Sequence, residues 1–184
     1  MRSDETRYDG ISIAVHWLMA LLVVVQVIAG VTMVRAGKGL LQNVLYDLHK
    51  SIGVTLLLLL LFRLIWRVRH PWPALPSSMA RSQILLARAN HVLLYAMLIV
   101  MPVSGFVFTA AGGYPIPYLR LVELSGLVPK NESLSKAALV VHLAGQWVVY
   151  ALVGLHVAGA LYHLLLRKDG VFQRMLPSGR AGRP

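Results

Sequence analysis

The sequence contains no cysteine. Disulfide bonds, thiolate-bound metals and iron–sulfur clusters all need cysteine sulfur, so these sites are excluded. Haem attached covalently through a Cys-x-x-Cys-His motif is excluded for the same reason. Any metal or cofactor must be held by other side chains, and the seven histidines are the strongest candidates.

Charged residues are also scarce. They make up 14% of the 184 residues, hydrophobic residues make up 57%, and the mean hydropathy is +0.66. This composition is too apolar for an ordinary soluble domain. Stretches without Lys, Arg, Asp or Glu run over 11–34, 89–119 and 137–166. A shorter stretch over 51–62 continues past Arg63, whose long side chain we expect to snorkel to the membrane surface.

These stretches predict transmembrane helices, because a bilayer core needs about 20 apolar residues per helix. We predict an all-α membrane protein, a single domain over 1–184, with four helices at about 11–34, 46–67, 83–111 and 135–167. Ser135 is the predicted N-cap of the last helix. We expect residues 118–124 to form a short helix on the outer membrane surface. The tail 174–184 is expected to be disordered.

Acidic residues are few, at 7 against 18 lysines and arginines. The net charge of +11 can indicate nucleic-acid binding, but the basic residues follow the predicted topology instead. With the N-terminus in the cytoplasm, the 18 basic residues divide into twelve inside and six outside. This is the positive-inside bias. We therefore predict a multi-pass membrane protein that contacts lipid, has both termini in the cytoplasm and has no nucleic-acid partner.

Four histidines lie where two bis-histidine haems would need them in a four-helix bundle: His16, His49, His142 and His156. The last two share one helix, fourteen residues apart. At about 1.5 Å and about 100° per residue, they lie roughly 21 Å apart and within roughly 40° of one face. The topology places His49 and His142 near the outer face, and His16 and His156 in the inner half. We predict these as an outer and an inner pair.

Haem suits such pairs better than zinc or copper. Neither pair has a cysteine or carboxylate nearby to complete a tetrahedral site. Haem brings four equatorial nitrogens, so two axial imidazoles suffice. With both axial positions filled, we predict outer-sphere electron transfer by two haems. Gly30, Gly53 and Gly145 fit a flat macrocycle between helices, and they fit close helix packing equally well.

Three histidines lie outside the two pairs. His163 and Arg167 follow His156 by seven and eleven residues, so they share its face nearer the cytoplasm. A histidine at this position can exchange a proton with a quinone while the haem exchanges the electron. The alternative is an interfacial histidine that anchors the helix. His91 is expected to bond a haem carboxylate or a neighbouring helix, and His70 to contact solvent.

Several motifs extend over nearly the whole chain. They are Val15-His16-Trp17, His49-Lys50-Ser51-Ile52-Gly53, Arg63-Leu64-Ile65-Trp66-Arg67, Pro102-Val103-Ser104-Gly105, Leu155-His156-Val157-Ala158-Gly159 and Arg174-Met175-Leu176-Pro177. With these motifs the chain resembles the bacterial cytochrome b561 family, the small four-helix di-haem membrane cytochromes. The resemblance implies haem b on His16, His49, His142 and His156. It also implies a location in the bacterial inner membrane and electron exchange with ubiquinone.

At least one branch of the family resembles superoxide oxidases, which pass an electron from superoxide on the outer side to quinone. The resemblance places His163 at the quinone site. The expected activity is therefore superoxide:ubiquinone oxidoreductase, with His163 and Arg167 beside the quinone. Lys50, Lys130 and Lys136 are candidates for attracting superoxide, or they are ordinary interface lysines.

Two other functions remain open. The chain can instead be the cytochrome b subunit that links a dehydrogenase or hydrogenase to the quinone pool, with a periplasmic electron donor other than superoxide. A non-haem transporter is the third class, but it leaves the depth-matched histidines unexplained.

Overall fold

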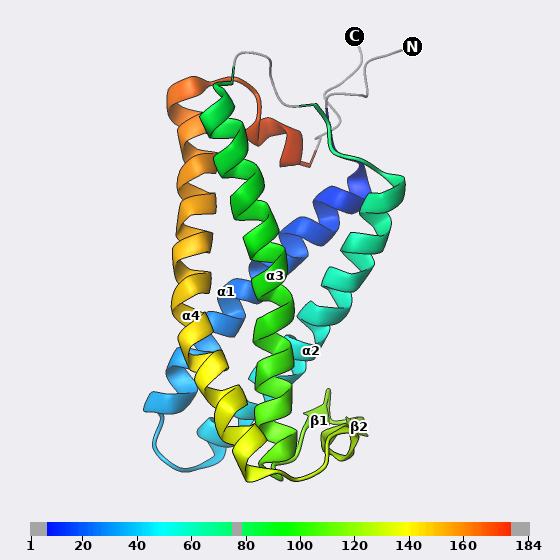
Figure 1. The fold of residues 1–184 in the computed structure, drawn as a ribbon, viewed down its shortest axis with the longest axis vertical. Helices are drawn as coiled ribbons and strands as arrows, with labels where there is room; N and C mark the ends of the chain where they lie inside the picture. The colour runs from blue at the N-terminus through cyan, green and yellow to red at the C-terminus, as the bar shows by residue number, and fades with distance from the viewer. Residues whose placement is uncertain (1–6, 75–78, 178–184) are drawn as a thin grey trace.

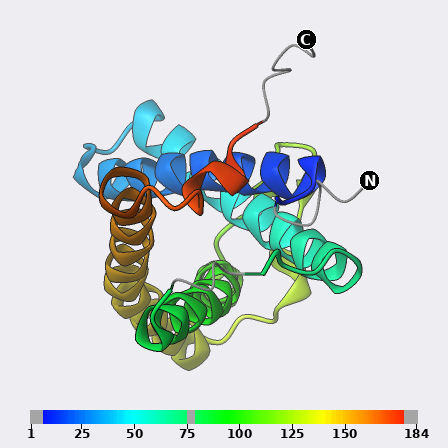
Figure 2. The same cartoon turned by 90° about the horizontal axis from the view of Figure 1, so that it is seen from above.

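The computed structural model describes residues 7–74 and 79–177. Its main elements are four helices long and apolar enough to cross a membrane, α1 (Gly10–Arg35), α2 (Leu40–Arg69), α3 (Arg81–Ala111) and α4 (Glu132–Leu161). Successive helices run in opposite directions (Figure 1) and follow one another around a common axis (Figure 2). The predicted four-helix membrane bundle is confirmed. We call the end with Gly10 and Arg69 the inner end and the opposite end the outer end, after the predicted orientation.

The connection between α1 and α2 is shorter than the sequence predicts. The second helix begins at Leu40, six residues before the predicted start at Tyr46. The Gln42 side-chain amide donates to the carbonyls of Met33 and Ala36, both at 3.1 Å. These carbonyls belong to the end of α1, where a helix leaves acceptors without an internal partner. The first turn of α2 therefore caps α1.

The start of α4 also differs from the prediction. Asn131, not Ser135, is the N-cap, and its Oδ1 accepts from the Leu134 amide at 2.9 Å. Ser135 Oγ instead donates to the Phe108 carbonyl at 2.9 Å. Ser135 thus joins α4 to α3 and lies one turn inside the helix. The prediction failed because this partner is distant in sequence.

The outer loop contains a hairpin and not the predicted helix at 118–124. Strands β1 (Pro117–Tyr118) and β2 (Val122–Glu123) pair antiparallel, with Leu119 and Arg120 both at positive φ (51° and 59°). The hairpin docks on α2, because Lys50 Nζ donates to the Pro115 carbonyl at 2.7 Å and the Leu119 amide to Ser51 Oγ at 3.1 Å. A short turn, η1 (Ser125–Leu127), follows.

At the inner end the chain turns back over the bundle. Helix α4 continues as a π-helical turn, η2 (Tyr162–Arg167), and the chain reverses at Lys168 and Gly170, both at positive φ. A short helix, η3 (Phe172–Met175), then crosses beside α1 (Figure 2). Trp17 Nε1 donates to the Met175 carbonyl at 2.6 Å. The prediction of disorder is therefore wrong for 174–177, and residues 178–184 lie outside the described part.

Packing is closest between α3 and α4. A Cβ atom on Gly145 would lie 2.6 Å from Met101 Sδ and 3.1 Å from Met97 Cε, so a larger residue would have to push these two side chains aside. A small core of Met19, Ile52, Leu56 and Leu60 joins α1 to α2. Apolar side chains on the outside of the bundle stay exposed, as expected of surfaces that contact lipid.

Candidate functional site

The outer histidine pair joins α2 to α4. The ring centres of His49 and His142 lie 6.1 Å apart, with an angle of 81° between the ring planes. His49 Nδ1 lies 3.2 Å from the Gln26 carbonyl, and His142 Nδ1 lies 2.9 Å from the Met101 carbonyl. A carbonyl only accepts, so Nδ1 of each ring carries the hydrogen. Nε2 of each ring therefore keeps its lone pair, as a metal ligand requires.

The inner pair joins α1 to α4. The ring centres of His16 and His156 are also 6.1 Å apart, at 68°. His91, on α3, lies beside this pair, with its ring centre 5.1 Å from that of His156. His91 Nδ1 lies 2.6 Å from the Ala87 carbonyl of its own helix. The structure thus brings both predicted pairs together at two depths and adds His91 to the inner one.

The pair geometry fits a bis-histidine haem. A metal–imidazole bond of about 2.0–2.1 Å puts the ring centre about 3.1 Å from the metal, so two rings on opposite sides lie about 6.2 Å apart. Both observed separations are 6.1 Å. Among the described residues no group of three or more His, Cys, Asp or Glu side chains is arranged to hold a metal ion. These pairs therefore suit a metal whose remaining ligands come with it.

Glycines make room for the outer rings. A Cβ on Gly30 would lie 3.1 Å from His49 Cε1, and one on Gly105 would lie 2.9 Å from His142 Cε1. The sequence left two interpretations open for its glycines. Gly30 leaves room for a histidine ring and Gly145 for helix packing, whereas a Cβ on Gly53 would meet the Gln26 side chain at 3.4 Å.

His163 has a partner that the sequence analysis missed. Its Nδ1 lies 2.8 Å from Asp169 Oδ2, and both side chains are largely buried, at 12% and 10% exposed. Arg167 Nε lies 3.9 Å from the same oxygen. Burial raises the pKa of Asp169, but hydrogen bonds from His163 and the Val171 amide lower it by more, to below its ordinary value of 3.8. Asp169 is the only acidic residue after Glu132 in the sequence, and this isolation could have indicated a partner for His163.

The three outer lysines do not form one cluster. Lys50 lies on α2 beneath the hairpin, 3.7 Å from Asp47. Lys130 and Lys136 line a cavity of about 460 Å³ at the outer ends of α3 and α4. Lys136 Nζ pairs with Glu132 at 2.6 Å. Two of the three charges are thus partly balanced by carboxylates.

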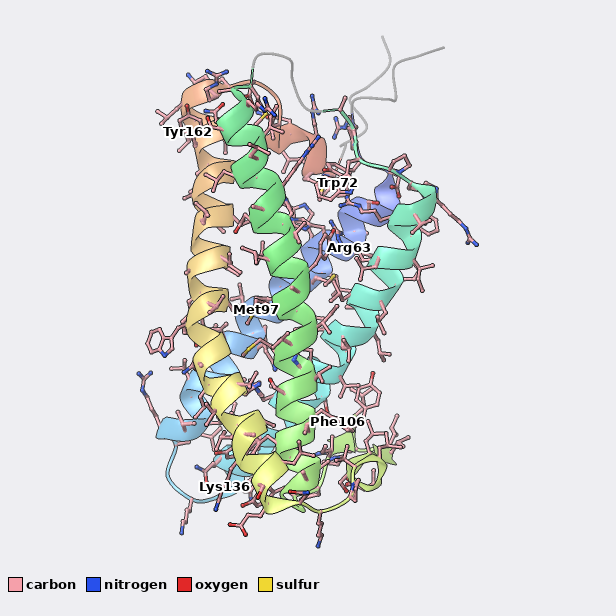
Figure 3. All side chains as sticks on the ribbon, viewed as in Figure 1. Arg63, Trp72, Met97, Phe106, Lys136 and Tyr162 are labelled. Carbon is pink, nitrogen blue, oxygen red and sulfur yellow. The ribbon has the colours of Figure 1, made fainter. Side chains whose placement is uncertain are left out.

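Arg63 does not snorkel outward as predicted. Its Nη1 donates to the Ser12 carbonyl at 3.0 Å and its Nε lies 3.4 Å from Tyr95 Oη. Figure 3 shows Arg63 in the inner half of the bundle, between α2 and α3. His70 was expected to contact solvent, and it is only partly buried, with its ring stacked on Trp66 at 4.1 Å between centres. The expectation for Arg63 failed because its partners, Ser12 and Tyr95, come from α1 and α3.

Comparison with known proteins agrees with this architecture. The family model described as prokaryotic cytochrome b561 matches residues 7–178. "Cytochrome b561 homolog 2" of Escherichia coli (strain K12) is 33% identical over 172 residues, covering 92% of this chain and 91% of that protein. "Probable superoxide oxidase CybB" of Yersinia pestis is 25% identical, covering 95% of this chain and 98% of that protein. "Cytochrome b561 homolog 1" of Escherichia coli (strain K12) is 25% identical, covering 93% and 97%.

Proposed function

The chain belongs to the prokaryotic cytochrome b561 family of transmembrane electron-transfer proteins, and on that premise we propose that it is a superoxide:ubiquinone oxidoreductase with two haem b groups. It lies in the bacterial inner membrane with both termini in the cytoplasm. The observation that carries the proposal is the presence of two histidine pairs at two depths, each with ring centres 6.1 Å apart. A path with one centre near each membrane face suits electron transfer across the bilayer.

His49 and His142 would hold the outer haem, and His16 and His156 the inner one. When bound, haem b supplies a reversible one-electron couple. The carbonyls of Gln26 and Met101 fix the tautomer of the outer ligands, and Ser104 Oγ adds a contact at 3.2 Å to His142 Nδ1. Hydrogen bonds of this kind orient ligand rings and raise their basicity.

The quinone would be reduced at the inner end, beside His163. Asp169 accepts from His163 Nδ1, which leaves Nε2 free to exchange a proton with a bound quinone. Arg167 lies beside the same carboxylate. The overall reaction balances when two superoxide anions are oxidised to dioxygen and one ubiquinone takes up two electrons and two protons to form ubiquinol. A π-helical turn at this point is typical of functional sites.

Superoxide would enter from the outer end. The relative from Yersinia pestis carries the name probable superoxide oxidase, and it aligns over 95% of this chain. Lys130 and Lys136 line the outer cavity, and Lys136 lies six residues before His142 on α4. Cationic surfaces raise encounter rates with anions by about 10–10³-fold. Lys50, held against Asp47 and the Pro115 carbonyl, contributes less to this field.

The test uses the purified protein in liposomes that contain ubiquinone. We expect a haemochrome assay to give two haems per chain, superoxide to reduce them and ubiquinol to form. His163→Ala should keep both haems and their reduction by superoxide, and should slow ubiquinone reduction. His70→Ala is the matched control, because this histidine also lies at the inner end but stacks on Trp66.

Three results would contradict parts of the proposal. One haem or none in the parent protein would exclude the two-haem assignment. Ubiquinone reduction at the parent rate in His163→Ala would move the quinone site elsewhere. A parent protein that superoxide does not reduce would instead favour a cytochrome subunit that serves a dehydrogenase or hydrogenase.

A further inference from the structure

Two arginines lie inside the membrane-spanning part of α2, and no acidic partner for them is found in the part of the chain that the structure describes. Arg63 and Arg67 are one helical turn apart, and both are partly buried. Both guanidinium groups reach Tyr95 Oη, at 3.4 Å from Arg63 Nε and 3.0 Å from Arg67 Nη1. Arg67 also lies over the Trp72 ring, 4.0 Å from its centre. Within 7–74 and 79–177, neither arginine forms an ion pair with a carboxylate.

This arrangement leaves two positive charges uncompensated. Arginine inside a membrane is costly unless it meets a counter-charge or a water-filled space. A hydroxyl group, a backbone carbonyl and an aromatic ring share the hydrogens but carry no negative charge. The carboxylate of Asp9 lies at the start of α1, but it accepts from Ser12 and Trp66 instead. The described residues therefore do not supply the expected anion.

The two arginines adjoin the inner histidine pair. The Ser12 carbonyl that receives Arg63 lies one helical turn before His16. Tyr95 lies one turn after His91, whose ring contacts that of His156. At the outer pair, Lys50 directly follows His49, but its charge is met by the Asp47 carboxylate at 3.7 Å.

We propose that Arg63 and Arg67, linked through Tyr95, bind the two carboxylates of the inner haem. The inference rests on the proposed function, because it assumes a haem between His16 and His156. Haem b carries two propionates, which match the two uncompensated guanidinium charges in number and sign. Guanidinium groups pair with carboxylates through two parallel hydrogen bonds, so they fix orientation as well as charge.

This site gives the electron path a direction. Reduction of a haem adds one negative charge to it, so nearby arginines stabilise the reduced form and raise the reduction potential. At the outer pair the adjacent cation, Lys50, is already paired with Asp47 at 3.7 Å and donates to the Pro115 carbonyl at 2.7 Å. The inner haem therefore has the higher potential, and an electron that enters at the outer end moves inward energetically downhill.

The test is a spectroelectrochemical titration of the purified full-length protein in lipid nanodiscs. In Arg63→Gln and in Arg67→Gln, we expect the inner haem's potential to fall by about 59 mV or more, which is a tenfold change in the ratio of reduced to oxidised haem. The outer haem's potential should not change. Arg63→Lys keeps the charge and should shift the inner potential less than Arg63→Gln. Arg69→Gln is the matched control, because Arg69 is an exposed arginine on the same helix.

Selective loss of the inner haem in the glutamine variants would also support the site. Unchanged potentials in variants that keep both haems would overturn it. If the glutamine variants do not fold, the proposal can be tested on the parent protein. The measurement is its redox-induced infrared difference spectrum with ¹³C-labelled haem carboxylates. Arginine-paired carboxylates stay ionised, so a protonated carboxylic acid band from the inner haem would refute the proposal. A parent protein without an inner haem would instead refute the proposed function.

Discussion

Gly105→Ala is the sharpest probe of the outer site. The added Cβ would lie 2.9 Å from His142 Cε1 and 3.1 Å from its Nδ1. Carbon atoms in ordinary contact are about 3.5–4.0 Å apart, so the ring must retreat by about 0.6 Å or more. That movement disturbs the contacts of Nδ1 with the Met101 carbonyl at 2.9 Å and with Ser104 Oγ at 3.2 Å. The substitution thus acts on a proposed ligand without changing it chemically.

The expected size follows from the packing. Overfilling a packed site costs about 1–3 kcal/mol, which corresponds to about 5- to 150-fold weaker haem binding at the outer position. The assay is transfer of haem from the purified protein to excess apomyoglobin, followed spectroscopically for each haem. The inner haem should transfer at the parent rate, because His16 and His156 contact neither Gly105 nor the ring that moves.

Gly154→Ala is the matched control. Gly154 lies on α4 two residues before His156, and nothing lies within 4 Å of its added Cβ. Both substitutions gain the same helix propensity, roughly 1 kcal/mol, so only the steric effect separates them. The reasoning would be refuted if Gly105→Ala kept its outer haem as firmly as the parent protein. Selective loss of the inner haem from this variant would also refute it.

Two further predictions concern the inner end. Because the pKa of Asp169 lies below its ordinary value of 3.8, its carboxylate stabilises the docked segment 169–177 fully above that pH. This contribution should disappear as the pH falls through the lowered pKa of Asp169 in the folded protein. The loss should be measured as faster hydrogen exchange of peptides over 162–177. In Asp169→Asn these peptides should exchange rapidly at every pH. A reporter fused after Pro184 should be active only in the cytoplasm, from the twelve-to-six division of the 18 basic residues. Activity only on the periplasmic side would reverse the orientation.

The sequence was sufficient to predict the four helices and which histidines face each other. Long apolar stretches and helical periodicity are local properties, and depth matching then selected the pairs. Helix boundaries were less accurate, because they depend on partners elsewhere in the chain. Gln42 caps α1 from the first turn of α2, and Ser135 bonds to α3 instead of capping its own helix.

The charged groups near the inner pair were also beyond the sequence pattern. An arginine near a helix end usually snorkels, and only the approach of α1 and α3 turns Arg63 toward Ser12 and Tyr95. Asp169 reaches His163 because Lys168 and Gly170 reverse the chain at positive φ. The hairpin contacts Ser51, which lies 68 residues before Leu119 in the sequence.

Helix α4 carries one histidine of each pair, and this has a consequence for how the two sites tolerate change. Their spacing is set inside one continuous helix, Glu132–Leu161. Tilting of α1 or α2 in bilayers of different thickness alters a partner's approach but not the separation of His142 from His156. Inserting one residue between them would rotate one imidazole by about 100° and break a site. The outer hairpin, in contrast, can change length without altering that spacing.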